Sequence, residues 1–124
     1  MTKEKARKLI ETYGKAWETK DPDLVVSLFT DDATYDDPHE PMSEGKEAIR
    51  QYWISKVIGE QDKIKFTLKN CWIDGNTVIA EWNAVFIDTK RNLHIDMTEV
   101  AIFGVRDEKF SSLREYYKTK KTAL

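Results

Sequence analysis

The stretch that decides the fold class runs from residue 62 to residue 86 and reads DKIKFTLKNCWIDGNTVIAEWNAVF. Apolar and polar side chains alternate along it, as they do in a strand that buries one of its faces. At its centre, Asp74-Gly75-Asn76 is a turn signal of the kind that joins two antiparallel strands. The same alternation returns over residues 93–103 and again over residues 110–118. The second half of the chain therefore predicts a meander of long antiparallel strands.

Upstream of these strands the apolar spacing changes to that of helices. Between residues 6 and 17 the apolar side chains recur three and four positions apart and share one face. Asp21-Pro22 indicates the start of a second helix, which we expect to extend through Phe29. Gly45 precedes a third helix, and Gly59 is interpreted as its left-handed stop.

A short strand over residues 33–36 and an irregular loop over residues 37–45 separate the second predicted helix from the third. Helices followed by a run of antiparallel strands are typical of the α+β class. Strands this long twist and curl, so we expect the helices to lie in the concave side of a cone. If the helices do not fill that cone, a pocket remains inside it.

Length and charge exclude several classes of protein. The 124 residues suit one domain over residues 1–124, and the net charge of −2 does not favour nucleic acid or an anionic membrane as a partner. No apolar stretch has the length of a signal peptide or a membrane span. Cys71 is the only cysteine, which makes a reducing compartment the default, so the expected location is cytoplasmic.

Two segments carry a resemblance to a known family: residues 29–38, FTDDATYDDP, and residues 45–53, GKEAIRQYW. They resemble the SnoaL-like, ketosteroid-isomerase-like branch of the nuclear transport factor 2 (NTF2-like) superfamily, and the likeness covers nearly the whole chain. It implies three N-terminal helices packed in the concave face of a strongly curled, mostly antiparallel sheet. It also implies a deep apolar pocket and a homodimer formed through the outer face of the sheet.

The resemblance further implies three catalytic positions. In the isomerases of this family an Asp after the first strand moves the proton, while a Tyr on the first helix and an acid on a later strand hold the oxyanion. The matching residues here are Asp37, Tyr13 and Glu99, the last being a Glu where the family pattern has an Asp. Positioned acids and bases suffice for such chemistry, so no cofactor is expected.

Glu99 also stands out without the family. It shares strand parity with the apolar residues Leu93, Ile95, Met97, Ala101 and Phe103. An acid in such surroundings has a raised pKa and, when neutral, can donate a hydrogen bond to a developing oxyanion. The alternative is an ion pair between Glu99 and Arg114 on the next strand.

Asp37 and Tyr13 each have an ordinary structural explanation as well. Asp37 and Pro38 can form a turn in which the Asp side chain binds its own backbone. Tyr13 can simply pack in the core with its hydroxyl at the edge. The residues expected to contact a ligand are Trp17, Tyr35, Trp53, Trp82 and Met97. The tryptophans, with Trp72 among the expected core residues, could instead fill the cone completely.

No motif for a metal or a phosphate is present. The chain has two histidines, prolines interrupt any ligand spacing near His39, and no glycine-rich phosphate loop occurs. We therefore weigh three functions: proton transfer on a hydrophobic carbonyl compound by an isomerase, cyclase or dehydratase; non-catalytic binding of a hydrophobic small molecule; and protein interaction through the outer sheet. For that outer face the expected apolar residues are Ile73, Ile79, Val85 and Ile87.

Overall fold

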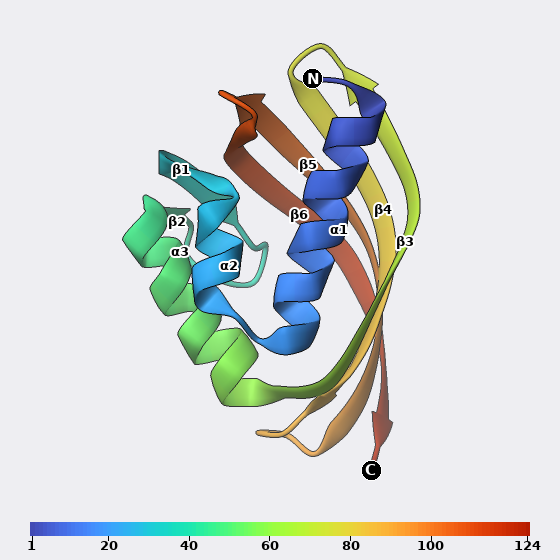
Figure 1. Cartoon of the computed structure of the whole chain (residues 1–124). Coiled ribbons are helices and arrows are strands. Elements are labelled where there is room, and N and C mark those ends of the chain that lie inside the picture. The colour runs from blue at the N-terminus through green and yellow to red at the C-terminus, as the bar shows by residue number, and fades with distance from the viewer.

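A six-stranded sheet in the order β2-β1-β6-β5-β4-β3 forms the frame of the molecule, whose computed structural model describes residues 1–124 (Figure 1). Its strands are β1 (Phe29–Asp36), β2 (Ser43–Glu44), β3 (Gln61–Asp74), β4 (Thr77–Asp88), β5 (Leu93–Arg106) and β6 (Lys109–Ala123). All neighbours are antiparallel except β1 and β6, which run parallel. Because β2 and β3 are edge strands that do not pair with each other, the sheet curls without closing.

The helices occupy the concave side of this sheet. They are α1 (Lys3–Thr19), α2 (Pro22–Ser27) and α3 (Lys46–Trp53), and α3 continues into a π-helical turn, η1 (Ile54–Ile58). Figure 1 shows α1 lying across the long strands, with α2 and α3 beside it. Asp21 caps α2, as predicted, by accepting a hydrogen bond from the backbone nitrogen of Leu24 at 3.0 Å. The structure thus confirms the α+β cone expected from the sequence.

Three local predictions are wrong. The second helix ends at Ser27, and Phe29 begins β1, because its side chain packs on Phe110 of the parallel strand β6. The loop over residues 37–45 contains the short strand β2, which pairs with β1. Gly59 has a φ of −77° and ends η1 in the right-handed region, so it is not a left-handed stop.

No helix combines the length and apolar character that a membrane crossing would require.

A β-bulge in β3 corrects the predicted orientation of two residues. Leu68 pairs with Trp82 and Asn70 with Glu81, which leaves Lys69 without a partner of its own. One extra residue reverses the side-chain alternation beyond it. Trp72 therefore points outward and is 49% exposed, while Ile73 packs against the core. The sequence-based expectation had placed both on the opposite faces.

A second bulge, in β6, decides which charged residue faces the helices. Gly104 pairs with Ser112 and Val105 with Phe110, so Ser111 is the extra residue. Straight alternation from the buried Phe110 would turn Arg114 inward. With the bulge, Glu115 is buried and Arg114 is exposed. The ion pair between Glu99 and Arg114, which was the alternative explanation for Glu99, is therefore not formed.

Gly14 allows the helical layer to approach the sheet closely, and this contact yields a prediction. A Cβ added at Gly14 would lie 2.2 Å from the ring of Phe66, which is itself packed between the rings of Trp17 and Trp82. Overpacking of this kind costs roughly 1–3 kcal/mol, against about 1 kcal/mol gained in helix propensity. We expect Gly14→Ala to lower the free energy of unfolding by up to about 2 kcal/mol in urea titrations followed by circular dichroism.

The matched control is Gly59→Ala, because Gly59 already has a right-handed conformation and its added Cβ would lie 3.4 Å from the nearest atom. This variant should be as stable as the wild type or more stable. Equal stability of the Gly14→Ala and Gly59→Ala proteins would show that the close approach at Gly14 is not a constraint.

Candidate functional site

A cavity of about 310 Å³ lies between the helices and the concave face of the sheet. Its wall includes Tyr13, Trp17, Tyr35, Asp37, Trp53, Met97 and Glu99, all of which the sequence had singled out. Trp82, expected to contact a ligand, does not line it: the ring is fully buried and packs on Tyr13, Phe66 and Phe103. The possibility that tryptophans fill the cone completely is wrong, because Trp17 and Trp53 border a void.

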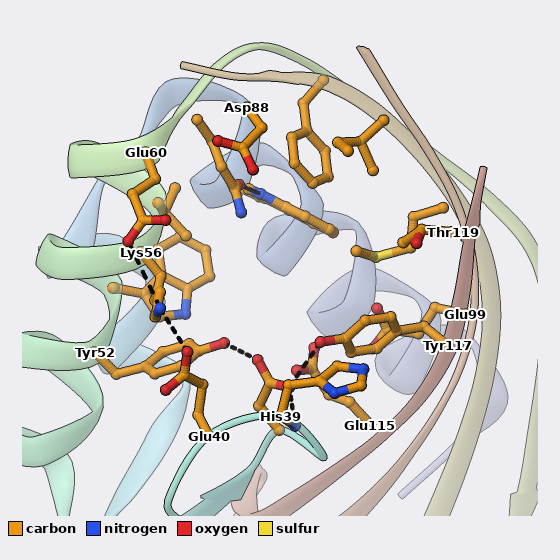
Figure 2. A pocket seen from close by; sticks show the side chains of 18 of the residues that line it. His39, Glu40, Tyr52, Lys56, Glu60, Asp88, Glu99, Glu115, Tyr117 and Thr119 are labelled. Atoms are coloured by element: carbon orange, nitrogen blue, oxygen red, sulfur yellow. Dashed lines mark hydrogen bonds and ion pairs between the residues drawn. The ribbon is translucent and has the colours of Figure 1, made fainter. Parts of the chain in front are cut away.

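Asp37, just after β1, is held by three hydrogen-bond donors. The hydroxyl of Tyr52 donates to its Oδ2, and the hydroxyl of Tyr117 donates to its Oδ1 at 2.7 Å. The backbone nitrogen of His39 also donates to Oδ1, at 3.0 Å. In Figure 2, dashed lines mark the hydrogen bonds that Tyr52 and Tyr117 donate. The sequence offered two alternatives for Asp37, a turn in which it binds its own backbone and a place in the site. The structure has both, because Asp37 accepts from the backbone of His39 and also lines the cavity.

A second set of hydrogen bonds links α1, β1 and β6. The hydroxyls of Tyr13 and Tyr35 lie 2.7 Å apart, and the Tyr35 hydroxyl lies 3.4 Å from Oε1 of Glu115. Tyr13 and Tyr35 are both buried, which raises the pKa of each phenol, and the Glu115 carboxylate adds to this effect. Both hydroxyls therefore keep their protons, and each has one proton to donate.

Glu99 is 1% exposed, and neither of its carboxyl oxygens has a hydrogen-bond partner. Its cross-strand neighbours on the inner face are Trp82 and Tyr117, and no lysine or arginine forms an ion pair with it. Burial raises its pKa well above the ordinary value, and the carboxylates of Glu115 and Asp37 raise it further. Glu99 is therefore a buried acid on the cavity wall that keeps its proton to a higher pH than an exposed glutamate does.

Sequence reasoning missed three residues of this site: Tyr52, Tyr117 and Glu115. Tyr52 lies in the third predicted helix, but its hydrogen bond to Asp37 depends on where the loop after β1 places that carboxyl. Glu115 and Tyr117 face the cavity only because of the bulge at Ser111. The alternation of Leu113, Glu115 and Tyr117 was the available signal, and it could be used only once the register was known.

The rim of the cavity is a chain of ion pairs rather than an apolar edge. Lys56 contacts Glu40 at 2.5 Å and Glu60 at 3.6 Å, and Arg91 contacts Glu60 at 3.2 Å and Asp88 at 2.9 Å. Figure 2 shows Lys56 between its two carboxyl partners. The wall is therefore aromatic and acidic inside and charged at its edge, which is more polar than the sequence suggested.

No three His, Cys, Asp or Glu side chains are grouped so that they could hold a metal ion. The groups available for chemistry in the cavity include the carboxyl of Asp37, the neighbouring acids Glu99 and Glu115, and the tyrosine hydroxyls. This set contains a base and separate proton donors, which is what proton transfer to and from a bound molecule needs.

The raised pKa of Glu99 predicts how stability changes with pH. The folded protein keeps the proton on Glu99 above pH 4.5, where the unfolded chain releases it, so stability falls as the pH rises through that range. We expect Glu99→Gln to flatten this decline by up to about 1.4 kcal/mol per pH unit. Urea unfolding between about pH 4.5 and pH 8.5, followed by tryptophan fluorescence, measures it.

The control for this experiment is Glu44→Gln, which removes the same charge from the exposed strand β2. It should leave the slope of stability against pH as it is in the wild type. An unchanged slope in Glu99→Gln would mean that Glu99 is ionised in the folded protein at neutral pH.

Comparison with known proteins gives one family match over most of the chain. A family model described as a SnoaL-like domain matches residues 10–113. No curated protein sequence matches the chain.

Several solved structures share the fold. A putative isomerase from Bacillus subtilis is 23% identical, with a TM-score of 0.83 over 95% of this chain and 90% of that one. SalBIII, an epoxide hydrolase/cyclase-like enzyme of pyran ring formation in the polyether salinomycin, is 24% identical, with a TM-score of 0.77 over 93% and 92%. A hypothetical protein with a ketosteroid isomerase-like fold from Catenulispora acidiphila, in complex with trimethylamine, is 19% identical, with a TM-score of 0.80 over 89% of this chain and 85% of that one.

Proposed function

The chain belongs to the SnoaL-like domain family, and we propose that it binds a small molecule in its cone and transfers a proton on that molecule with side chains alone. The observation that carries this proposal is the pairing, in one cavity, of the hydrogen-bonded carboxyl of Asp37 with the buried acid Glu99, which no cation neutralises. Structures of the same fold named as an isomerase and as an epoxide hydrolase/cyclase-like enzyme support an activity of this kind.

In this mechanism Asp37 is the base. It removes a proton from the carbon beside a carbonyl, and the electrons of the broken C–H bond move onto the carbonyl oxygen to form an enolate. Tyr13 and protonated Glu99 donate hydrogen bonds to that oxygen as its charge develops. Asp37 then returns the proton to another carbon of the conjugated system, so the double bond moves and no atom is gained or lost.

The preferred substrate is a hydrophobic carbonyl compound. Aromatic rings of Tyr13, Trp17, Trp53 and Phe86 line the cavity, whose volume of about 310 Å³ is at the small end of ligand sites. A molecule with one carbonyl group and an apolar ring would use both the acids and the aromatic wall. The same acid–base set would serve a cyclisation or a dehydration.

The second candidate is a binding protein without catalysis. It is favoured by the state of Asp37, because a carboxylate has about four lone-pair positions and Tyr52, Tyr117 and the His39 nitrogen occupy three of them. A base must keep a lone pair free for the substrate proton. The two candidates therefore differ in whether the remaining position of Asp37 points at a bound ligand.

Replacement of the proposed base separates these candidates. We expect Asp37→Asn to lower turnover of β,γ-unsaturated cyclic ketones by at least about 100-fold, measured as growth of conjugated-enone absorbance, because general base catalysis is worth that much or more. Binding of the ketones, measured by quenching of Trp17 and Trp53 fluorescence, should change little.

The matched control is Asp74→Asn, the same change at the exposed end of β3, outside the cavity wall. Its turnover should equal that of the wild type. Ketone binding by a wild-type protein that turns none of them over would favour the binding candidate, and full activity in Asp37→Asn would remove Asp37 from the mechanism.

A homodimer through the outer face of the sheet is part of this proposal. Trp72 and Tyr116 are 49% and 53% exposed there, and the half-buried Ile79 and Ile102 lie beside Trp72 on the next strands. We expect Trp72→Lys to convert a dimer into a monomer in size-exclusion chromatography with light scattering. Ile58→Lys, the same change at an exposed apolar residue of η1, should leave the dimer intact. A monomeric wild type would contradict the dimer.

A further inference from the structure

Glu115 is a buried acid that the proposed mechanism does not use. It is 7% exposed and lines the cavity, and no lysine or arginine pairs with it. Its hydrogen-bond partner is the hydroxyl of Tyr35, 3.4 Å away, which in turn contacts the hydroxyl of Tyr13 at 2.7 Å. Glu115 therefore ends a chain whose other end, Tyr13, is the proposed donor to the ligand.

The direction of this chain follows from counting protons. Each tyrosine hydroxyl has one proton to donate and can also accept. If Glu115 is ionised it can only accept, so Tyr35 donates to Glu115, Tyr13 donates to Tyr35, and Tyr13 has no proton left for a ligand. If Glu115 is protonated it can donate to Tyr35, Tyr35 donates to Tyr13, and the Tyr13 proton is free. Tyr35 cannot donate to Glu115 while Tyr13 donates to a ligand. In that arrangement neither hydroxyl would donate to the other, and their lone pairs would face each other across 2.7 Å.

We propose that Glu115 is a positioning residue, which as a carboxylic acid turns the hydroxyls of Tyr35 and Tyr13 so that Tyr13 can donate to a ligand oxygen. The inference rests on the proposed function, because it is there that Tyr13 acts as a donor to the oxyanion. It adds a requirement to that function: the site binds an oxyanion only while Glu115 holds its proton.

The surroundings of Glu115 favour the protonated state. The titratable groups that face it are Glu99 on β5, Tyr35 on β1, Asp37 just after β1, Tyr13 on α1, and Tyr52 and Tyr117 beside Asp37. None of these is a cation. Burial raises the pKa of Glu115 first, and the carboxylates of Asp37 and Asp36 add to it, while the hydrogen bond from Tyr35 acts in the opposite direction. Glu99 and Glu115 lie diagonally across β5 and β6, so they titrate as a pair.

The test needs no ligand and uses the whole chain. Protein labelled with ¹³C at Glu Cδ and Tyr Cζ is titrated by NMR from about pH 4 to about pH 9, a range that spans the raised pKa of a buried carboxyl. We expect the Tyr13 Cζ resonance to shift with the same midpoint as the Glu115 Cδ resonance. When Glu115 loses its proton, the Tyr13 hydroxyl stops accepting a hydrogen bond from Tyr35 and donates one to Tyr35 instead. The Tyr116 resonance, on the outer face, is the internal control and should stay constant through that midpoint.

Two variants separate relay through Tyr35 from a direct effect of charge. In Tyr35→Phe the Glu115 charge is kept but the chain is broken, so Glu115 should still titrate while the shift of Tyr13 is lost. In Glu115→Gln no charge appears, and the Tyr13 shift at that midpoint should also be lost. Circular dichroism checks that both variants are folded.

Each outcome decides the proposal. A Tyr13 resonance that stays flat while Glu115 titrates in the wild type would overturn it without any variant. A Tyr13 shift that persists in Tyr35→Phe would also overturn it, because the charge alone would then explain the effect. Because no substrate takes part, failure of the proposed catalysis leaves this result unchanged, and failure of the relay leaves the role of Asp37 as base to be judged by its own test.

Discussion

The interior of this protein is organised around carboxyl groups that no cation neutralises. Glu99 and Glu115 project from adjacent strands into one aromatic cavity, and Asp37 faces the same space. A charge in such surroundings is costly, and like charges close together add to the cost. The fold meets this constraint in two ways: the acids on β5 and β6 have raised pKa values, and Asp37 is surrounded by hydroxyl and amide donors. The cavity therefore combines two acids that hold their protons more tightly than exposed glutamates do, Glu99 and Glu115, with a carboxyl that accepts hydrogen bonds, Asp37.

The distribution of charge separates the inside of the cavity from its edge. Every cation on the wall that forms an ion pair does so at the rim, where Lys56 and Arg91 neutralise Glu40, Glu60 and Asp88. These pairs link η1 to the loop after β1, and Glu60, which precedes β3, to the turn after β4. Deeper inside, tyrosine hydroxyls replace cations as the donors. A neutral donor can change the direction of its hydrogen bond as protons move, which a lysine or arginine cannot do.

The sequence predicted the fold and part of the site for different reasons. Apolar residues recur every three or four positions in the first part of the chain and every second position in the second part, and this change predicted the helices and the long strands. The buried face of β5 was predicted because Glu99 alternates in step with its apolar neighbours. Tyr13 and Asp37 were found through family resemblance, and the structure brings both to the cavity wall. Tyr52, Tyr117 and Glu115 were missed, because their contacts depend on a loop path and a strand register that no local pattern encodes.

Two single-residue bulges separate what the sequence determined from what the tertiary structure decided. The sequence by itself determined the order of the helices and long strands and the alternation of side chains within each uninterrupted segment, since both follow from local apolar spacing. It did not determine the bulges at Lys69 and Ser111, because the position of an extra residue depends on pairing with the neighbouring strand. As side chains alternate with a period of two, each bulge reverses every orientation beyond it. The first put Trp72 on the outer face, and the second put Glu115 rather than Arg114 into the cavity.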